Sequence, residues 1–386
     1  MMERRQIVEL WREPGTASGV AGTASGVLIT LVHAEGSTYR RPGARLLTAA
    51  MGSQADARGL YAGTISGGCL ESEVVRRARW MVRAGAVVER YSMAFDDTAE
   101  IPFGLGCGGT VDLLFEPAGA PEAEALFQAM SDSLAGVESI VVSFLPGGGR
   151  GLRRVVYSAD GRVVFASEGL DAKKIDCARA LEPGGEYEGR YVERLFRPQR
   201  LVILGAGDDA KPLAAMASSL GWSVLVADGR AQLARAERFP HAEQVLVLDD
   251  PDQLQIEPQD AVVLMTHSYE QDRTLLSGLL ASPRGPRYLG MLGSRHRSSL
   301  LVSEAAAMTG RSVSACCETV FAPVGLDLGG DGPEAIALAI VAEVQAFRHG
   351  RLSVSRKLTP GEVAEQLERG GSSRYLQAQC ALGAAE

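Results

Sequence analysis

Two cysteines lie in glycine-rich turns where a thiol can meet a ligand. Cys69 ends the run Gly63-Thr-Ile-Ser-Gly-Gly-Cys69, and Cys107 lies between Gly106 and Gly108. An apolar-periodic segment follows Cys69, so its thiol is expected near a helix N-terminus, where the dipole favours the thiolate. Glycines let a ligand approach the backbone closely. The pair suits a soft metal, a sulfur-bearing group or a reactive thiol, or else two small thiols packed in turns.

The remaining cysteines offer no such setting. Cys177, Cys316, Cys317 and Cys380 have no partner residues at metal-ligand spacing, and we interpret them as structural. Without a C-x-x-C pair or a spaced histidine, a zinc site is poorly supported anywhere in the chain. Six cysteines are also too few for a disulfide framework in so long a chain, which favours a reducing compartment.

An arginine cluster follows the first predicted strand. The run His33-Ala-Glu-Gly-Ser-Thr-Tyr-Arg-Arg-Pro-Gly-Ala-Arg45 contains Arg40, Arg41 and Arg45. Forked guanidinium groups in an acidic protein suit a phosphate or pyrophosphate, and a solvated loop is the alternative.

A nucleotide fingerprint opens the second half of the chain. Gly205-Ala-Gly207-Asp-Asp-Ala210 follows the strand-forming run 201–204 and precedes a helical segment. Gly205 permits the tight turn, Gly207 lets a pyrophosphate approach, and Asp228 lies where a carboxylate binds a ribose hydroxyl. This pattern favours NAD or another adenine nucleotide. Asp208 and Asp209 oppose it, because they place negative charge at a helix N-terminus, so a Rossmann domain without a nucleotide stays open.

Further polar loops are expected at the same edge of the sheet. His267 follows a predicted strand and either contacts a ligand or caps a loop. Gly293, Ser294 and Arg295 form an anion site or an ordinary turn with a surface arginine.

The elements that position these residues divide the chain into two halves. The first is predicted as an α/β domain with cysteine-bearing turns (1–117), followed by a β-rich connecting region (118–199). The second is a Rossmann-like, doubly wound parallel sheet (200–350) with a C-terminal tail (351–386). The predicted strands are 27–33, 111–115, 139–144, 154–158, 162–166, 201–204, 223–227 and 261–266, and the predicted helices are 1–13, 70–84, 122–134, 209–220, 333–347 and 360–368.

Composition excludes several classes of protein. The chain has 386 residues, of which 46% are apolar, so it can bury sizeable cores. A net charge of -8 with no separate basic block disfavours a nucleic-acid binder. The longest apolar stretch, 335–342, is too short to span a bilayer, and residues 1–13 lack the apolar run of a secretion signal. We therefore expect a cytoplasmic protein, and a homodimer as the commonest assembly.

Taken together, the motifs resemble those of the xanthine dehydrogenase accessory proteins, the XdhC and CoxI family. The resemblance covers about residues 27–347. Its carriers are Glu35-Gly-Ser-Thr-Tyr-Arg-Arg-Pro-Gly-Ala-Arg45, Gly67-Gly-Cys-Leu-Glu71, Gly106-Cys-Gly-Gly109 with Glu116-Pro117, Gly205-Ala-Gly207, Met265-Thr-His267, Gly290-Met-Leu-Gly-Ser-Arg295, and Gly325-Leu-Asp-Leu-Gly329 with Pro333-Glu334. Asp208 departs from the family pattern, which often has histidine there.

The resemblance implies a maturation chaperone. Such proteins bind the molybdenum cofactor (molybdopterin), support its sulfuration and insert it into a molybdenum hydroxylase of the xanthine dehydrogenase or carbon monoxide dehydrogenase type. The implied partners are that apo-hydroxylase and a cysteine desulfurase or other sulfur donor. Carried over by position, the resemblance places the cofactor at the two cysteine turns, with Cys107 contacting molybdenum. The implied contacts are Gly67, Gly68, Cys69, Gly106, Cys107 and Gly108, with Arg41 and Arg45 at the pterin phosphate.

Two other functions fit the residues. One is an NAD-dependent oxidoreductase in which Asp228 holds ribose, His267 transfers a proton and the thiols act in redox. The other is a redox-sensing interaction protein in which Cys69 and Cys107 form a reversible disulfide.

Overall fold

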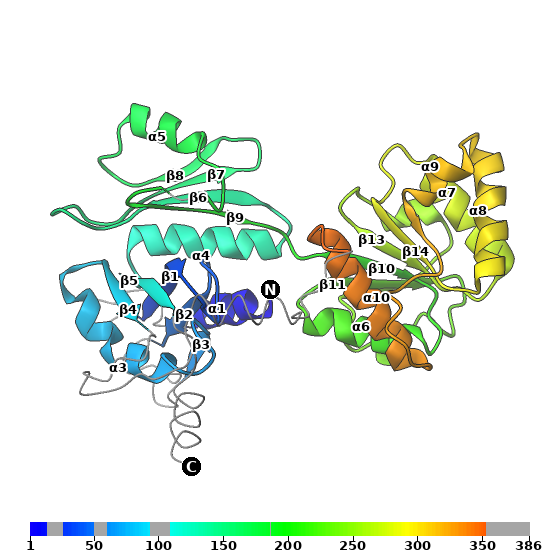
Figure 1. Cartoon of the computed structure of the whole chain (residues 1–386), viewed down its shortest axis with the longest axis horizontal. Helices are drawn as coiled ribbons and strands as arrows, with labels where there is room; N and C mark the ends of the chain where they lie inside the picture. The colour runs from blue at the N-terminus through cyan, green and yellow to red at the C-terminus, as the bar shows by residue number, and fades with distance from the viewer. Residues whose placement is uncertain (14–25, 50–59, 93–108, 186, 353–386) are drawn as a thin grey trace, which may run out of the picture.

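A computed structural model describes residues 1–13, 26–49, 60–92, 109–185 and 187–352. These residues form two lobes, with the N-terminus between them (Figure 1). The N-terminal lobe contains two antiparallel sheets, and the C-terminal lobe contains one parallel sheet. The predicted helix 360–368, Cys380, and Gly106, Cys107 and Gly108 lie outside the described residues.

The first antiparallel sheet has five strands in the order β3-β2-β1-β5-β4. Long apolar runs form the central pair, while the short outer strands were not predicted from the sequence. One face packs on α3, and the other packs on α1 and α4. The elements are α1 (Met2–Arg12), β1 (Val27–Glu35), β2 (Arg45–Thr48), β3 (Tyr61–Gly63), α3 (Glu71–Met81), η1 (Val82–Ala84), β4 (Val87–Ser92) and β5 (Thr110–Pro117).

The second antiparallel sheet has the order β8-β7-β6-β9 and covers the far side of α4 (Figure 1). Helix α4 is therefore sandwiched between two sheets and buries Phe127 and Met130. A fully buried ion pair also connects the sheets, since Arg154 Nη1 lies 2.9 Å from Glu116 Oε2. The elements are α4 (Pro121–Leu134), β6 (Ser139–Phe144), β7 (Arg153–Ser158), β8 (Val163–Ala166), α5 (Ala172–Arg179) and β9 (Arg190–Leu195).

The C-terminal lobe is a six-stranded parallel sheet in the order β12-β11-β10-β13-β14-β15. In chain order this is 3-2-1-4-5-6, the Rossmann arrangement. Helices α6 and α10 cover one face, and α7 and α8 cover the other. The elements are β10 (Arg200–Leu204), α6 (Ala210–Ser219), β11 (Ser223–Asp228), η2 (Ala236–Arg238), β12 (Gln244–Val247), η3 (Pro251–Leu254), β13 (Ala261–Leu264), α7 (Tyr269–Ala281), β14 (Tyr288–Met291), α8 (Arg295–Thr309), α9 (Val313–Cys317), β15 (Val320–Phe321) and α10 (Pro333–Arg348).

Helix α1 joins the lobes. Its inner face buries Ile7, Val8 and Leu10 in the N-terminal lobe. Its start reaches the C-terminal lobe, where Arg5 Nη2 lies 2.9 Å from Glu243 Oε1. Met1 packs so closely on Gly221 that a Cβ at that glycine would lie 2.5 Å from the Met1 Cβ. The first residues of the chain thus contact both halves of the molecule.

Candidate functional site

The loop after β10 has the backbone that the nucleotide fingerprint requires. Gly205 has φ +123°, and a Cβ there would lie 2.3 Å from the Met265 carbonyl oxygen. No other residue fits this turn without displacing β13. At Gly207 the nearest atom to an added Cβ would be His267 Nε2 at 3.4 Å, so this side of the loop is more open.

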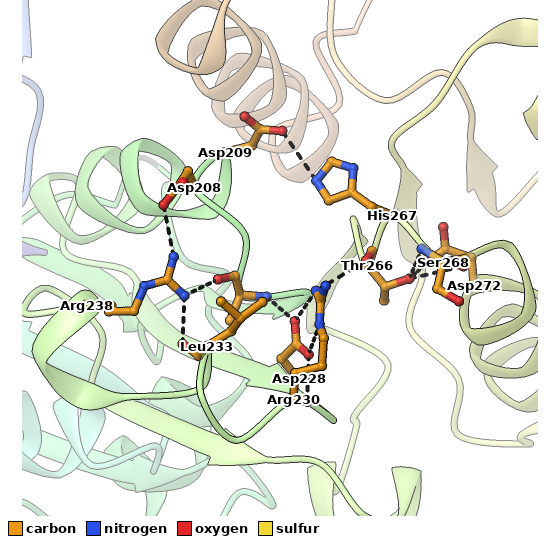
Figure 2. Close-up of polar contacts among 11 residues, drawn as sticks. Asp208, Asp209, Asp228, Arg230, Leu233, Arg238, Thr266, His267, Ser268 and Asp272 are labelled. Carbon is orange, nitrogen blue, oxygen red and sulfur yellow. Dashed lines mark hydrogen bonds and ion pairs between the residues drawn. The ribbon is translucent and has the colours of Figure 1, made fainter.

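Asp228, the last residue of β11, holds this loop in place through hydrogen bonds. It is 3% exposed, and its Oδ2 accepts a hydrogen bond from the Ala206 N–H at 2.7 Å (Figure 2). Its Oδ1 accepts from the Arg230 N–H at 2.8 Å, and the Arg230 guanidinium contacts both oxygens. Burial alone would raise the pKa of Asp228, but these hydrogen bonds lower it. The carboxylate predicted to hold a ribose is thus already bound within the protein, and Arg230 lies over it.

Asp208 and Asp209 differ in their surroundings. Asp208 is exposed and lies 2.7 Å from Lys211 Nζ and 2.9 Å from Arg238 Nη2, which lower its pKa. Asp209 Oδ2 lies 3.5 Å from Nε2 of His267 (Figure 2). Lys211 and Arg238 therefore balance the charge of Asp208 at this helix start.

His267 has an unusual backbone for a residue with a side chain. Its φ is +61°, in the left-handed region, and its ring reaches across the loop toward Gly207 and Asp209. Such conformations persist where neighbouring structure enforces them, and they gather at functional sites. The sequence predicted that His267 contacts a ligand or caps a loop at this edge of the sheet, and both roles stay predictions.

A second carboxylate network lies behind Thr266. Thr266 Oγ1 donates to Asp272 Oδ1 at 2.7 Å, and Arg297 Nη2 lies 2.7 Å from Asp272 Oδ2. Ser294 accepts from the Arg297 N–H as the N-cap of α8, and Arg295 is exposed. In the Gly293–Arg297 segment, the arginine with a buried carboxylate partner is therefore Arg297, two residues beyond the one predicted.

A cavity of about 280 Å³ opens at this edge beside Asp228. Its walls are largely apolar, with Leu204, Leu248 and Leu275 among them, and Gln271 adds an amide. The strand order reverses between β10 and β13, and open α/β sheets bind ligands at such a point.

The Cys69 turn is the second place where candidate residues meet. Gly67, Gly68 and Cys69 are all exposed, and the turn leads directly into α3. Buried Glu71 holds the turn from inside, because its carboxylate accepts from the N–H groups of Ile65, Ser66 and Gly68 at 2.9 to 3.1 Å.

The hydroxyl groups of Thr64 and Ser66 complete the clamp on Glu71. Burial would raise the pKa of Glu71, but hydrogen bonds from Ser66, Thr64 and the backbone bring it to about 2. Ser66 Oγ in turn accepts from the N–H groups of Cys69 and Leu70 at 3.1 and 3.0 Å. Five N–H groups of the turn, those of Ile65, Ser66, Gly68, Cys69 and Leu70, are thus bonded internally, while the Cys69 thiol stays exposed.

The loop after β1 closes over the Cys69 turn. A Cβ at Gly67 would lie 2.9 Å from the ring of Tyr39, which is itself 73% exposed. A Cβ at Gly109 would lie 2.4 Å from the Ser37 carbonyl oxygen. Gly109 follows Cys107 by two residues in the sequence. The loop after β1, the Cys69 turn and Gly109 therefore lie together in the N-terminal lobe.

The arginine cluster is dispersed. Arg40 pairs with Glu3 of α1, with Nη1 2.8 Å from Oε1. Arg45 is 6% exposed and ion-paired with Glu193 of β9, so its guanidinium already has a partner inside the lobe, and its role as an anion contact stays a prediction. Of the three arginines, Arg41 is the exposed one, and it can meet a ligand.

Within the described ranges, no group of three or more His, Cys, Asp or Glu side chains is arranged to hold a metal ion. In the same ranges, no helix is long and apolar enough to cross a bilayer.

Comparison with known proteins decides the family. Residues 201–344 match the XdhC Rossmann domain, and residues 20–92 match the XdhC and CoxI family. A Bacillus subtilis (strain 168) protein, named as a probable xanthine dehydrogenase subunit, is 30% identical over 334 residues, which are 82% of this chain and 92% of that protein. The chain belongs to the XdhC and CoxI family.

Two further relatives extend the likeness. A crystal structure described as a xanthine dehydrogenase from Bacillus halodurans has a TM-score of 0.74 and 26% identity, covering 94% of this chain and 99% of that chain. An Escherichia coli (strain K12) protein named uncharacterized protein YqeB is 30% identical over 187 residues, which are 47% of this chain and 32% of that protein. As an XdhC and CoxI family member, the chain is a xanthine dehydrogenase accessory-type protein, as the motifs predicted.

Three residues of these sites were missed by sequence reasoning. Glu71 appeared only as the last letter of a motif, and Arg230 and Arg297 were not noted. The one local signal was an acidic residue in the first turn of a helix, which ordinarily indicates interaction with the dipole.

Proposed function

We propose that this protein is a maturation factor that carries the molybdenum cofactor to a molybdenum hydroxylase of the xanthine dehydrogenase or carbon monoxide dehydrogenase type and supports its sulfuration. Family membership and the relative named as a xanthine dehydrogenase subunit support the class of client. The cofactor is cargo here, bound and released rather than retained. Its partners would be the apo-hydroxylase and a sulfur donor such as a cysteine desulfurase, and the working form would be a homodimer.

The observation that carries the proposal is the exposed Cys69 thiol. It projects from a turn whose backbone N–H groups are held by the buried Glu71 carboxylate. Thiolate sulfur suits molybdenum and its sulfur ligands. Gly68 leaves room for a planar ring to approach, since an added Cβ there would meet nothing within 4 Å, and the exposed Tyr39 ring covers the neighbouring Gly67. Arg41 is the remaining cation for the pterin phosphate.

The thiol of Cys107 belongs to the same proposal through its place in the sequence, two residues before Gly109. Gly109 contacts the loop that also covers the Cys69 turn. We therefore assign Cys107, with Gly106 and Gly108, to the cargo site as a prediction that mutation can test.

The test uses the full chain. Purified protein is mixed anaerobically with free molybdenum cofactor, gel-filtered, and assayed for molybdenum and for oxidised pterin. We expect both to elute with the protein at near-stoichiometric amounts and to activate an apo-hydroxylase in proportion to the loaded chain. Failure to retain the cofactor, with its integrity shown in the starting solution, would overturn the proposal.

A second candidate function is nucleotide binding by the C-terminal lobe. The cavity beside Asp228 at the reversal of strand order supports it, as does the balancing of Asp208 by Lys211 and Arg238. An NAD-dependent oxidoreductase would then use His267 for proton transfer. Tight NAD(H) binding with a substrate-dependent change in reduced-nicotinamide absorbance would support it, and absence of NAD(H) binding would exclude it.

A further inference from the structure

A large crevice lies at the opposite edge of the parallel sheet, between the two lobes. It has a volume of about 1080 Å³. One wall comes from the β6–β9 sheet, with Glu138, Arg194 and Phe196, and the other from the C-terminal lobe, with Arg287 and Arg348. It shares no residue with the Asp228 cavity or the Cys69 turn, so neither proposed site accounts for it.

Every carboxylate in the crevice wall already has an arginine partner. Glu138 Oε2 lies 2.9 Å from Arg194 Nη2, and Asp160 Oδ2 lies 2.8 Å from Arg162 Nε. On the other wall, Glu257 and Asp260 share Arg197, with the Asp260 pair at 3.0 Å.

A surplus of positive charge remains after this pairing. Among the described residues, no carboxylate lies within ion-pair distance of Arg287 or Arg348. Arg287 is exposed, and Arg348 is half-buried at the end of α10. Burial lowers the pKa of Arg348, against which the more distant Glu138 acts only in part.

Arg4 does not line the crevice but contacts Phe196, which does. Its Nη1 donates to Ser133 Oγ at 2.9 Å and to the Phe196 carbonyl oxygen at 2.8 Å, both of them neutral acceptors. Burial, with Arg45 and Arg348 nearby, lowers the pKa of Arg4 to about 10. Glu193 opposes these effects in part, and the charges of Arg4 and Arg348 repel each other.

Several polar contacts hold the segment that crosses between the lobes at the crevice. Arg197, in the segment that crosses between the lobes, is fixed to Asp260. Gln199 Nε2 donates to the Gln259 carbonyl oxygen at 3.0 Å, and Arg200 donates to the Leu254 carbonyl oxygen at 2.9 Å. These contacts tie the segment 197–200 to the C-terminal-lobe wall of the crevice.

We infer that this crevice binds a small phosphorylated molecule, with its phosphate held by Arg287 and Arg348. Guanidinium groups bind phosphate oxygens with paired, charge-assisted hydrogen bonds. The exposed side chains of Val137 and Phe196 supply apolar surface for the rest of the ligand. Because both lobes line the crevice, an occupant would tie the cysteine-bearing half to the Rossmann-like half.

The probe is inorganic pyrophosphate, titrated calorimetrically into the full chain with a metal chelator present and ionic strength held constant. We expect one binding site per chain. The double variant R287Q/R348Q should weaken binding at least tenfold, whereas the control R311Q/R351Q, which removes two exposed arginines outside the crevice, should bind within twofold of the wild type. Unchanged affinity in R287Q/R348Q, or no binding to the wild-type chain, would overturn the inference.

Thermal unfolding separates a binding role from a structural one. Without pyrophosphate, R348Q should unfold at the same temperature as the wild type or higher, because it relieves repulsion with Arg4. With pyrophosphate, the wild type should gain stability and R287Q/R348Q should not. A marked loss of stability in R348Q alone would show that Arg348 serves the fold, and would contradict the inference.

Discussion

The Cys69 turn and the Gly205 turn have the same construction and different outer surfaces. Each is a glycine-rich connection from a strand to a helix, and each is tied by a buried carboxylate that accepts backbone N–H groups. At Cys69 the carboxylate, Glu71, comes from the helix that follows, and the exposed residues of the turn, 67–69, carry no charged side chain. At Gly205 it comes from the neighbouring strand as Asp228, and outside it Asp208 pairs with Lys211 and Arg238 while Asp209 contacts the His267 ring.

The difference indicates what each turn can bind. At the first, internal acceptors bond five N–H groups of the turn, and the exposed Cys69 thiol is its reactive side chain. At the second, ion pairs surround the loop, and any nucleotide must displace or share them. A thiol-reactive cargo suits the first surface, and a ligand with several polar contacts suits the second.

The largest effect is expected where the turn cannot admit a side chain. Gly205→Ala places a Cβ 2.3 Å from the Met265 carbonyl oxygen at φ +123°. We expect the free energy of unfolding to fall by about 4 kcal/mol, because the backbone is strained and β13 is displaced. Hydrogen exchange should speed up in the C-terminal lobe and stay unchanged in β1 and β5. Wild-type protection in β10 and β13 would show that the loop relaxes at little cost.

Breaking the clamp of the first turn comes next. Glu71→Gln should cost about 3 kcal/mol at neutral pH, because an amide cannot accept all five hydrogen bonds. The pKa of Glu71 is lowered from 4.5 to about 2. The contribution of this carboxylate to the free energy of unfolding is therefore complete above pH 4.5 and is lost as the pH falls through about 2. Denaturant titrations should show the gap between wild type and variant closing over that range. A constant gap would contradict the charge-based account.

The matching change in the second turn should cost less. Asp228→Asn keeps an acceptor for the Ala206 N–H but leaves the Arg230 guanidinium, which is partly solvated, without its counter-charge. We expect a loss of about 2 kcal/mol, measured by denaturant unfolding followed at Trp222 of the C-terminal lobe. If Asp228→Asn lowered the free energy of unfolding as much as Glu71→Gln, the two buried carboxylates would stabilise their turns equally.

The smallest change in stability is expected at Gly68. Its φ is +103°, but an added Cβ would meet nothing within 4 Å. Gly68→Ala should therefore cost about 1 kcal/mol, from backbone strain alone. Thermal unfolding beside Gly205→Ala gives the comparison directly. A loss as large as that of Gly205→Ala would show that the Cys69 turn is more crowded than its structure indicates.

Sequence patterns predicted the elements with long apolar runs. The strand Ser139–Phe144 was predicted at its observed bounds, and Pro333 begins its helix as expected. Strands such as Arg45–Thr48 were missed, because four residues carry little periodicity. The pairing of Arg45 with Glu193 could not be predicted, because the two residues are 148 positions apart and only the folded chain brings them together. The same holds for the Glu116–Arg154 pair, whose partners lie on different sheets.

The reactive side chains of the candidate site could be predicted from the sequence, but the side chains that hold the backbone around them could not. Cys69 and His267 stood out because thiols and imidazoles are rare and chemically distinctive. Glu71 and Arg297 did not, because a glutamate or arginine near a helix start is ordinarily a solvated residue. Only burial reveals that these side chains hold the backbone in place.

The central claim is that the Cys69 thiol contacts the molybdenum cofactor. The most direct measurement is retention of molybdenum and pterin after anaerobic gel filtration, comparing the wild type, Cys69→Ser and the control Cys177→Ser, which changes another exposed thiol on α5. We expect Cys69→Ser to lose at least nine-tenths of the bound cofactor with unchanged unfolding temperature, and Cys177→Ser to retain it. Full retention by Cys69→Ser would contradict the assignment of the cargo site to this turn.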